Sequence, residues 1–162
     1  MFNFKIETYF KIIFIISFVS IISAYFIEYI LGYQPCNLCL IERVPYWLSI
    51  ILIFTNYILK KNEKFFILLL ILIFVFSFAV AFYHFGIEQG FFQESTVCGF
   101  KNASEIISKE ELLKQLSKKM ISCKDVTFKI FGLSLTTINI IINFFIITFL
   151  LKLFKKYDKF KK

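Results

Sequence analysis

The sequence has few of the residues that interrupt helices. Of its 162 residues, only five are Gly and two are Pro. Proline in particular breaks a helix, because it has no amide hydrogen to donate. Long segments therefore lack both residues, and of the two prolines only Pro45 lies inside a candidate helix. The length allows one domain, residues 1–162, with no room for a second folded one.

Polar residues are also scarce, since 59% of the chain is hydrophobic, whereas a soluble domain is nearer to about half. A membrane-spanning helix needs about 20 mainly apolar residues. Four stretches satisfy this, at residues 12–31, 40–59, 65–85 and 131–151. The first is longer than the roughly 7–15 apolar residues of a signal peptide, so we expect a retained span. We predict an all-α membrane protein, a four-transmembrane-helix bundle.

The net charge of +8 is distributed unevenly. Four spans place both termini on one side, and that side carries eleven cations and three acids, while the rest of the chain is balanced. By the positive-inside rule the basic side is cytoplasmic. Nucleic-acid binding is disfavoured, because the lysines flank spans. The cations on this side are Lys5, Lys11, Lys60, Lys61, Lys64, Lys152, Lys155, Lys156, Lys159, Lys161 and Lys162.

The opposite side carries all four cysteines, in a short connection at residues 32–39 and a long loop at residues 86–130. In a bacterium this side is the periplasm, where disulfides form. Within the loop, Ser108 and Glu111 match a capping box. The apolar spacing that follows, up to Met120, predicts a short amphipathic helix. It either lies on the membrane surface or packs on the bundle.

Cys36 and Cys39 form a CxxC motif at the start of the second span, after Pro35. A helix N-terminus favours the thiolate, and one turn brings the two sulfurs within bonding distance. The motif is also found as half of a zinc site, but structural zinc needs four ligands. Cys98 and Cys123 lie about 25 residues apart and the chain has one histidine, His84. We therefore predict no metal site.

Cys98 and Cys123 permit two interpretations. A disulfide between them closes a long loop, which typically stabilises a fold by about 2–4 kcal/mol. Alternatively, they take part in thiol–disulfide exchange. The loop is polar, offers no core to cross-link and lies beside the CxxC motif, so exchange is favoured. Four cysteines allow three connectivities, which stay open at this stage.

Arg43 and His84 are the remaining candidates. Arg43 lies four residues after Cys39, so the two share a helix face. A charge inside a span suggests a function, here support of a Cys39 thiolate or a hydrogen bond to a ligand. The alternatives are a pair with Glu42 or Glu28, or a side chain extended to the interface. His84, near the outer end of the third span, is either an interfacial residue or a ligand contact.

The stretch from Gln34 to Arg43 resembles the P-C-x-L-C-x-x-E-R signature of the disulfide bond formation protein B (DsbB) family. Residues 83–90, and residues 123–126 running into 131–135, resemble segments found in many members. The resemblance covers nearly the whole chain, with the same four spans and cysteine order. Glu28 matches no pattern and has no assigned role.

The resemblance implies an inner-membrane, quinone-dependent dithiol oxidase that supports disulfide formation in exported proteins. The Cys98–Cys123 disulfide would oxidise a periplasmic DsbA-like dithiol protein, with Cys98 as the sulfur joined to it. Cys36 and Cys39 would then reoxidise the loop pair. Cys39 would face the quinone, either ubiquinone or menaquinone. Arg43 would support the charge, and His84 stands where members place a quinone-site histidine.

Two rival functions fit part of the pattern. A vitamin K epoxide reductase-like enzyme shares CxxC and four spans, but the Pro-Cys-x-Leu-Cys-x-x-Glu-Arg motif before the long loop argues against it. A membrane scaffold with two structural disulfides is the other. The direction of electron flow rests on the resemblance, because the spacing alone fits a reductase equally well.

Overall fold

The computed structural model describes residues 2–59, 62–93, 98, 122–124, 128–130 and 132–160. The amphipathic helix expected between Ser108 and Met120 lies outside these residues. Within them, the chain forms four long helices: α1 (Phe2–Tyr29), α2 (Asn37–Leu59), α3 (Glu63–Glu88) and α5 (Leu135–Phe160). A two-stranded antiparallel hairpin, β1 (Lys129–Ile130) and β2 (Leu133–Ser134), precedes α5.

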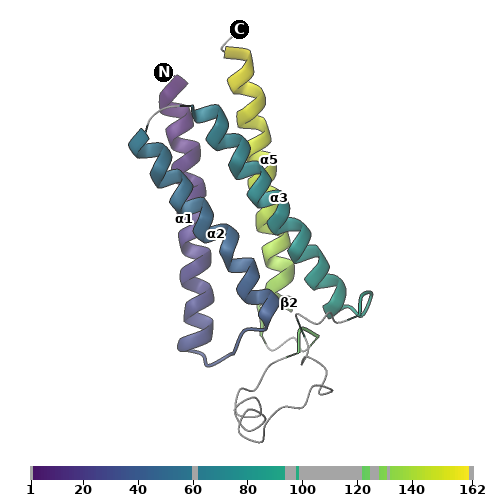
Figure 1. Ribbon diagram of the computed structural model, residues 1–162. Helices are drawn as coiled ribbons and strands as arrows, with labels where there is room; N and C mark the ends of the chain where they lie inside the picture. The colour runs from purple at the N-terminus through teal and green to yellow at the C-terminus, as the bar shows by residue number, and fades with distance from the viewer. Residues whose placement is uncertain are drawn as a thin grey trace, which may run out of the picture.

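All four helices are long and apolar enough to cross a membrane. They run side by side in a bundle with both termini at one end (Figure 1). Helix α3 packs against α2 and α5, and α1 packs against α2. Their buried faces share one apolar core, which includes Ile13, Leu70, Phe74 and Leu150. The predicted four-helix membrane bundle is confirmed.

The outward faces of the helices are apolar as well. Large side chains such as Phe54, Phe76 and Phe145 are more than half exposed, as expected where helices face lipid. Between α1 and α2, the hydroxyl of Ser49 donates a buried hydrogen bond of 2.9 Å to that of Ser17. Small polar residues allow helices to approach closely inside a membrane.

Helix α3 continues to Glu88, three residues beyond the span expected from apolar composition. It ends in a Schellman motif, in which the amide of Phe91 donates to Gly86 and that of Gly90 to Ile87. Gly90 has a φ of 77°, in the left-handed region that glycine adopts without strain. The additional turn therefore keeps Glu88 on the helix.

Helix α5 starts at Leu135, four residues later than expected. The hairpin turns at Gly132, which has a φ of 83°, so the chain is not helical there. The hydroxyl of Ser134 then accepts the amide hydrogen of Thr137 at 3.2 Å, as an N-cap residue does. The hairpin and the short α1–α2 connection lie at the end of the bundle opposite the termini (Figure 1).

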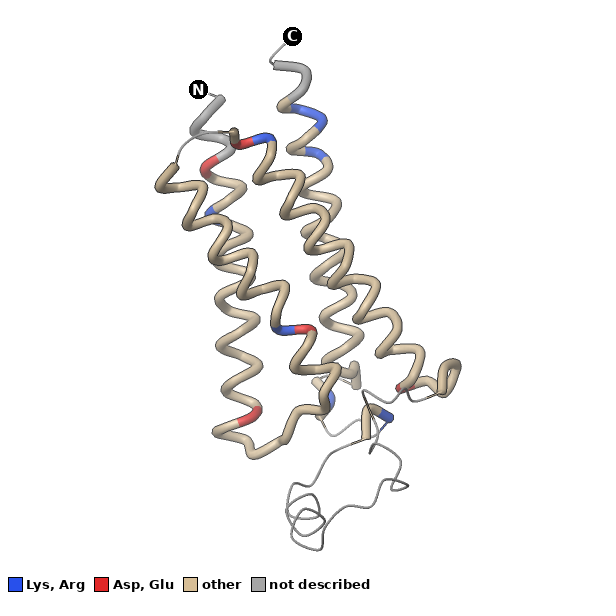
Figure 2. Tube along the Cα trace, in the orientation of Figure 1, with Lys and Arg blue, Asp and Glu red and all other residues tan. Residues whose placement is uncertain are grey.

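Charged residues are rare in the middle of the bundle (Figure 2). The neighbouring red and blue segments partway along α2 are Glu42 and Arg43, the charged residues of that helix. A charge at this depth needs a partner, because the surrounding lipid and side chains cannot solvate it.

Candidate functional site

All four cysteines meet at the end of the bundle opposite the termini. Cys98 and Cys123 form a disulfide, with their Cα atoms 5.5 Å apart. Cys36 and Cys39 are free thiols whose sulfurs are 2.8 Å apart. Both pairs belong to one buried cluster, in which Leu38 and Ile87 also pack. Of the three connectivities left open by the sequence, the structure has Cys98 joined to Cys123.

Cys36 directly precedes α2 and caps it. Its Sγ accepts the backbone N–H of Cys39 at 3.3 Å, in the way that an N-cap side chain satisfies a free amide. The hydrogen bond with Cys39, and after it the contact with His84, lower the pKa of Cys36 to about 4, although burial raises it. Cys36 is therefore the thiol that this site favours as a thiolate.

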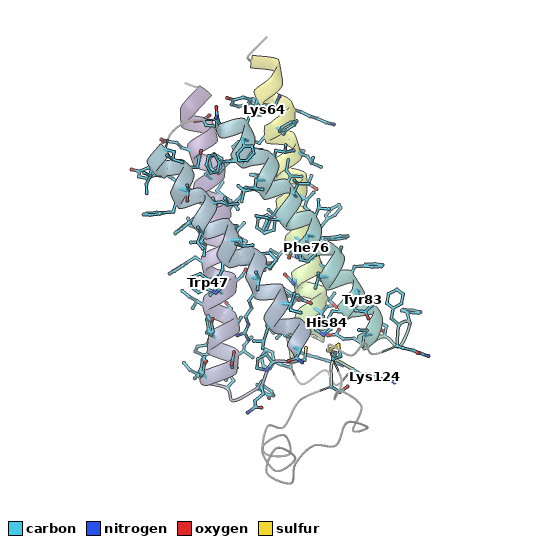
Figure 3. All side chains as sticks on the ribbon, in the orientation of Figure 1. Trp47, Lys64, Phe76, Tyr83, His84 and Lys124 are labelled. Carbon is cyan, nitrogen blue, oxygen red and sulfur yellow. A yellow bond between two sulfur atoms is a disulfide. The ribbon has the colours of Figure 1, made fainter. Side chains whose placement is uncertain are left out.

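His84 lies on α3 and is only 2% exposed. Its Nε2 is 3.5 Å from Cys36 Sγ, and its Nδ1 is 2.7 Å from Glu42 Oε1. A carboxylate can only accept, so Nδ1 donates and Nε2 faces the sulfur. Figure 3 shows His84 beside Tyr83, at the end of the bundle where the sulfur atoms lie. His84 is thus a buried partner of the CxxC motif and not an interfacial residue.

The second oxygen of Glu42 is held by α5. Asn139 Nδ2 donates to Glu42 Oε2 at 2.6 Å, and the Tyr46 hydroxyl donates to Asn139 Oδ1 at 2.5 Å. Both oxygens of the carboxylate are therefore paired, which a buried charge requires. No motif in the sequence marks Asn139, although an amide in an apolar span was an available signal.

Glu88, one turn after His84 on α3, is the second carboxylate of the site. It accepts hydrogen bonds from the hydroxyls of Ser134, at 2.7 Å, and Thr136, at 2.6 Å. Its Oε1 is 3.9 Å from His84 Nε2. These bonds join the last turn of α3 to β2 and to the first turn of α5.

Arg43 pairs with Glu28 of α1, with 2.5 Å between Nη1 and Oε2. Its guanidinium also lies over the ring of Tyr25, 5.1 Å from the centroid, which is within the range of a cation–π contact. Of the alternatives weighed from the sequence, the pair with Glu28 is the one formed. Glu28 thus acquires a structural role that no motif indicated.

A cavity of about 330 Å³ adjoins these groups, within the range of roughly 300–1,000 Å³ typical of ligand pockets. Cys36, Cys39, Arg43 and His84 line it, together with apolar side chains of α1 and α5. A quinone has a flat apolar ring with two carbonyl oxygens that accept hydrogen bonds. Apolar walls with a guanidinium donor and two thiols on one side fit such a group. The apolar lining residues include Val19, Ile21, Ile27, Ile138 and Ile142.

Together, the fold and this site define a multi-pass membrane protein with a thiol–disulfide redox centre at one end of its bundle. The family model described as disulfide bond formation protein DsbB matches residues 7–153. The chain belongs to the DsbB family. Membership implies an oxidoreductase role in disulfide bond formation with a link to quinones.

One curated relative is similar to this chain over most of its length. An uncharacterized protein of Rickettsia prowazekii (strain Madrid E) is 31% identical over 137 residues, which cover 83% of this chain and 80% of that protein. No solved structure matches the chain.

The structure brings together the six residues predicted from the sequence. Five of them line the cavity, and the sixth, Cys98, is bonded to Cys123. Their roles in the reaction stay predictions, because position alone assigns none of them. The five lining residues are Cys36, Cys39, Arg43, His84 and Cys123.

Proposed function

We propose that the protein oxidises a periplasmic DsbA-like dithiol protein and passes the electrons to a membrane quinone, ubiquinone or menaquinone. It would thereby support disulfide formation in exported proteins. One observation carries the proposal: the Cys98–Cys123 disulfide and the Cys36 and Cys39 thiols pack in one buried cluster beside the cavity. Electrons can therefore pass between the pairs by thiol–disulfide exchange.

The loop disulfide reacts with the partner protein. A thiolate of the partner attacks Cys98 Sγ, and Cys123 leaves as a thiolate. The second partner thiol then attacks the mixed disulfide and releases the partner in its oxidised form. Cys98 and Cys123, now thiols, reduce a Cys36–Cys39 disulfide. This returns the site to the state in the structure, with the loop disulfide formed and Cys36 and Cys39 free.

Oxidation of Cys36 and Cys39 to a disulfide releases two electrons and two protons. His84 Nε2, 3.5 Å from Cys36 Sγ, accepts the proton of that thiol, and the Glu42 carboxylate stabilises the resulting imidazolium. Arg43 would hold a carbonyl oxygen of the ring, while the isoleucines of α1 and α5 exclude water. A bound quinone supplies the two-electron, two-proton acceptor. Cys39, which lines the cavity, would face it.

The distribution of charge supports an orientation. From the sequence, the side expected to carry both termini has eleven cations and three acids, a net charge of +8, and the positive-inside rule assigns that side to the cytoplasm. The chain would then be one membrane domain of the bacterial inner membrane, with its cysteines in the periplasm.

Quinone reduction by the purified protein tests the proposal, with a reduced DsbA-like protein as electron donor. We expect one quinone reduced for each dithiol oxidised, with no turnover in Cys36→Ser or Cys98→Ser. Thr148→Ala, on an exposed face of α5, is the matched control and should keep the wild-type rate. Absence of reduction of either quinone by folded protein with an intact loop disulfide would refute the function.

A further inference from the structure

Three sulfur and nitrogen atoms of the site form a metal-ligand group. Cys36 Sγ, Cys39 Sγ and a ring nitrogen of His84 all lie within 4.8 Å of one another. We propose that the reduced centre binds one thiophilic divalent cation, zinc above all, and that the bound ion reversibly inhibits the enzyme. The binding rests on the geometry alone, and the inhibition rests on the proposed function.

The ligand types and distances suit zinc. Tetrahedral zinc sites have Zn–S bonds of about 2.3 Å and Zn–N bonds of about 2.0–2.1 Å, so a ligand sulfur and nitrogen stand roughly 3.5 Å apart. Cys36 Sγ and His84 Nε2 are already at 3.5 Å. Two ligand sulfurs stand roughly 3.8 Å apart, so the two thiols, at 2.8 Å, must separate by about 1 Å. Cys39, which lines the cavity, has the space to rotate.

The surroundings of His84 match those of metal-bound histidines. Such histidines usually donate their other ring N–H to a carboxylate, which fixes the tautomer and orients the ring. Glu42 Oε1 accepts from Nδ1 at 2.7 Å, and Asn139 holds the other oxygen of Glu42. Nε2 is thereby left with its lone pair toward the sulfurs, as a zinc ligand must be.

The fourth position lies on the cavity side, because all three ligands line the cavity. Glu88 also lines it, with Oε1 3.9 Å from His84 Nε2. A water molecule or this carboxylate completes a tetrahedron. Zinc displaces the protons of both thiols, so one ion binds, two protons leave, and the two thiolates neutralise its charge.

Binding is restricted to one redox state. A Cys36–Cys39 disulfide has no thiolate to offer, so only the reduced centre holds the ion. Once bound, the ion is coordinated by both sulfurs and by His84, so Cys36 and Cys39 cannot form a disulfide. From the sequence, zinc was not expected, because the spacing of Cys98 and Cys123 makes them poor additional ligands. The fold brings His84 beside the two thiols as the third ligand, and the fourth coordination position faces the cavity.

Cobalt(II) titration of the full-length Cys98→Ser/Cys123→Ser variant tests this, since Cys36 and Cys39 are then the only thiols. The reduced protein should bind one equivalent, with a thiolate-to-cobalt charge-transfer band and tetrahedral visible bands that zinc abolishes. Glu42→Gln should weaken binding about 10–100-fold, and His84→Gln should weaken it more. Cys39→Ser, which keeps only the Cys36 thiol, should bind cobalt more weakly and with a weaker charge-transfer band, and the oxidised protein should show no such band.

Cobalt bound without a charge-transfer band is adventitious surface binding, and equal affinity in His84→Gln means that His84 is not a ligand; either result overturns the site. Wild-type protein that binds zinc at this site yet reduces quinone at an unchanged rate overturns the inhibition. Where inhibition occurs, a chelator should restore the rate. The titration uses neither quinone nor partner. Cobalt binding by a protein that fails to reduce quinone therefore refutes the proposed function and leaves the metal site standing.

Discussion

Glu42 Oε1 lies 2.7 Å from His84 Nδ1, and the other nitrogen of the same ring faces Cys36 Sγ at 3.5 Å. Three residues from α2, α3 and the segment before α2 thus form a line from carboxylate to imidazole to sulfur. The same order occurs where a histidine activates a nucleophile and a third group orients it. From this line we predict that His84, which also lines the cavity, takes part in the thiol chemistry of Cys36.

Replacement of Glu42 by Gln tests whether the Glu42–His84–Cys36 arrangement contributes to catalysis. Glu42→Gln keeps the shape of the side chain but removes the charge that stabilises a protonated His84. We expect oxidation of the Cys36–Cys39 dithiol to slow by about 10–100-fold, as fits loss of a charge-assisted hydrogen bond of roughly 1.5–3 kcal/mol, with little change in the apparent KM for quinone. Stopped-flow absorbance of quinone, with pre-reduced enzyme, measures this rate.

Two comparisons separate a catalytic effect from a structural one. Glu63→Gln, at the first turn of α3, should leave the rate unchanged, because that residue is at the opposite end of the bundle. Glu42→Asp should restore part of the rate, since the charge returns at a longer distance. Equal losses in Glu42→Gln and Glu42→Asp would mean that Glu42 serves packing only.

Arg43 is predicted to act on the quinone side. Arg43→Ala should raise the apparent KM for quinone by about 10–100-fold, which corresponds to loss of a charge-assisted hydrogen bond of roughly 1.5–3 kcal/mol. The KM for the partner protein should change much less. Steady-state kinetics with each substrate varied in turn measures both constants, and equal increases would contradict a quinone-side role.

Glu28 should act through Arg43. Glu28→Gln leaves the guanidinium in place but removes its ionic partner at 2.5 Å. We expect the KM for quinone to rise by roughly 5-fold, as fits loss of a partly exposed pair of about 1 kcal/mol. In an Arg43→Ala background, Glu28→Gln should add nothing, since the residue through which it acts is absent.

The four spans could be predicted because each is coded locally, by about 20 consecutive apolar residues. The helix ends could not, because single residues set them: Gly90 in the left-handed region for α3 and the Ser134 cap for α5. Composition does not distinguish a glycine that ends a helix from one that lies within it, as Gly86 does.

The cysteines and Arg43 could be predicted from a short motif. The sequence offered Glu28 only as one of two candidate partners of Arg43, and it did not indicate that His84 and Glu42 stand beside Cys36. Glu42 and His84 are 42 residues apart, and Glu28 and Arg43 are 15 apart. Each pair forms because each helix turns one particular face toward its neighbour. Apolar residues surround these helices on all sides, so the sequence does not specify that face. A polar residue inside an apolar span, such as Asn139, indicates that a partner exists without saying which.

Cys98 is predicted to be the sulfur that the partner protein attacks. Cys98→Ala should abolish the covalent complex with a DsbA-like protein. Cys123→Ala is the matched control, because its free Cys98 thiolate can attack the disulfide of an oxidised partner and hold it. Non-reducing gel electrophoresis detects the complex. A complex that persists in Cys98→Ala and disappears in Cys123→Ala would exchange the two assignments.

The orientation can be measured with engineered cysteines in a variant that lacks the native ones. Lys124→Cys is exposed beside the disulfide, and Lys155→Cys is exposed at the end that carries the termini. A membrane-impermeant maleimide added to intact spheroplasts should label the first and not the second. After lysis both should react. The reverse pattern would place the cysteines in the cytoplasm and contradict the charge-based prediction.

Redox states in living cells distinguish an exchanger from a scaffold and set the direction of flow. When quinone synthesis is blocked, an oxidase of this kind loses its electron acceptor, so Cys36 and Cys39 should accumulate as thiols. A mass-tagging maleimide after acid quenching should then shift the protein by two tags, and restored quinone should reverse the shift. A scaffold would keep its disulfides under both conditions. A reductase would show the opposite response, because its cysteines would become oxidised once reduced quinone no longer supplied electrons.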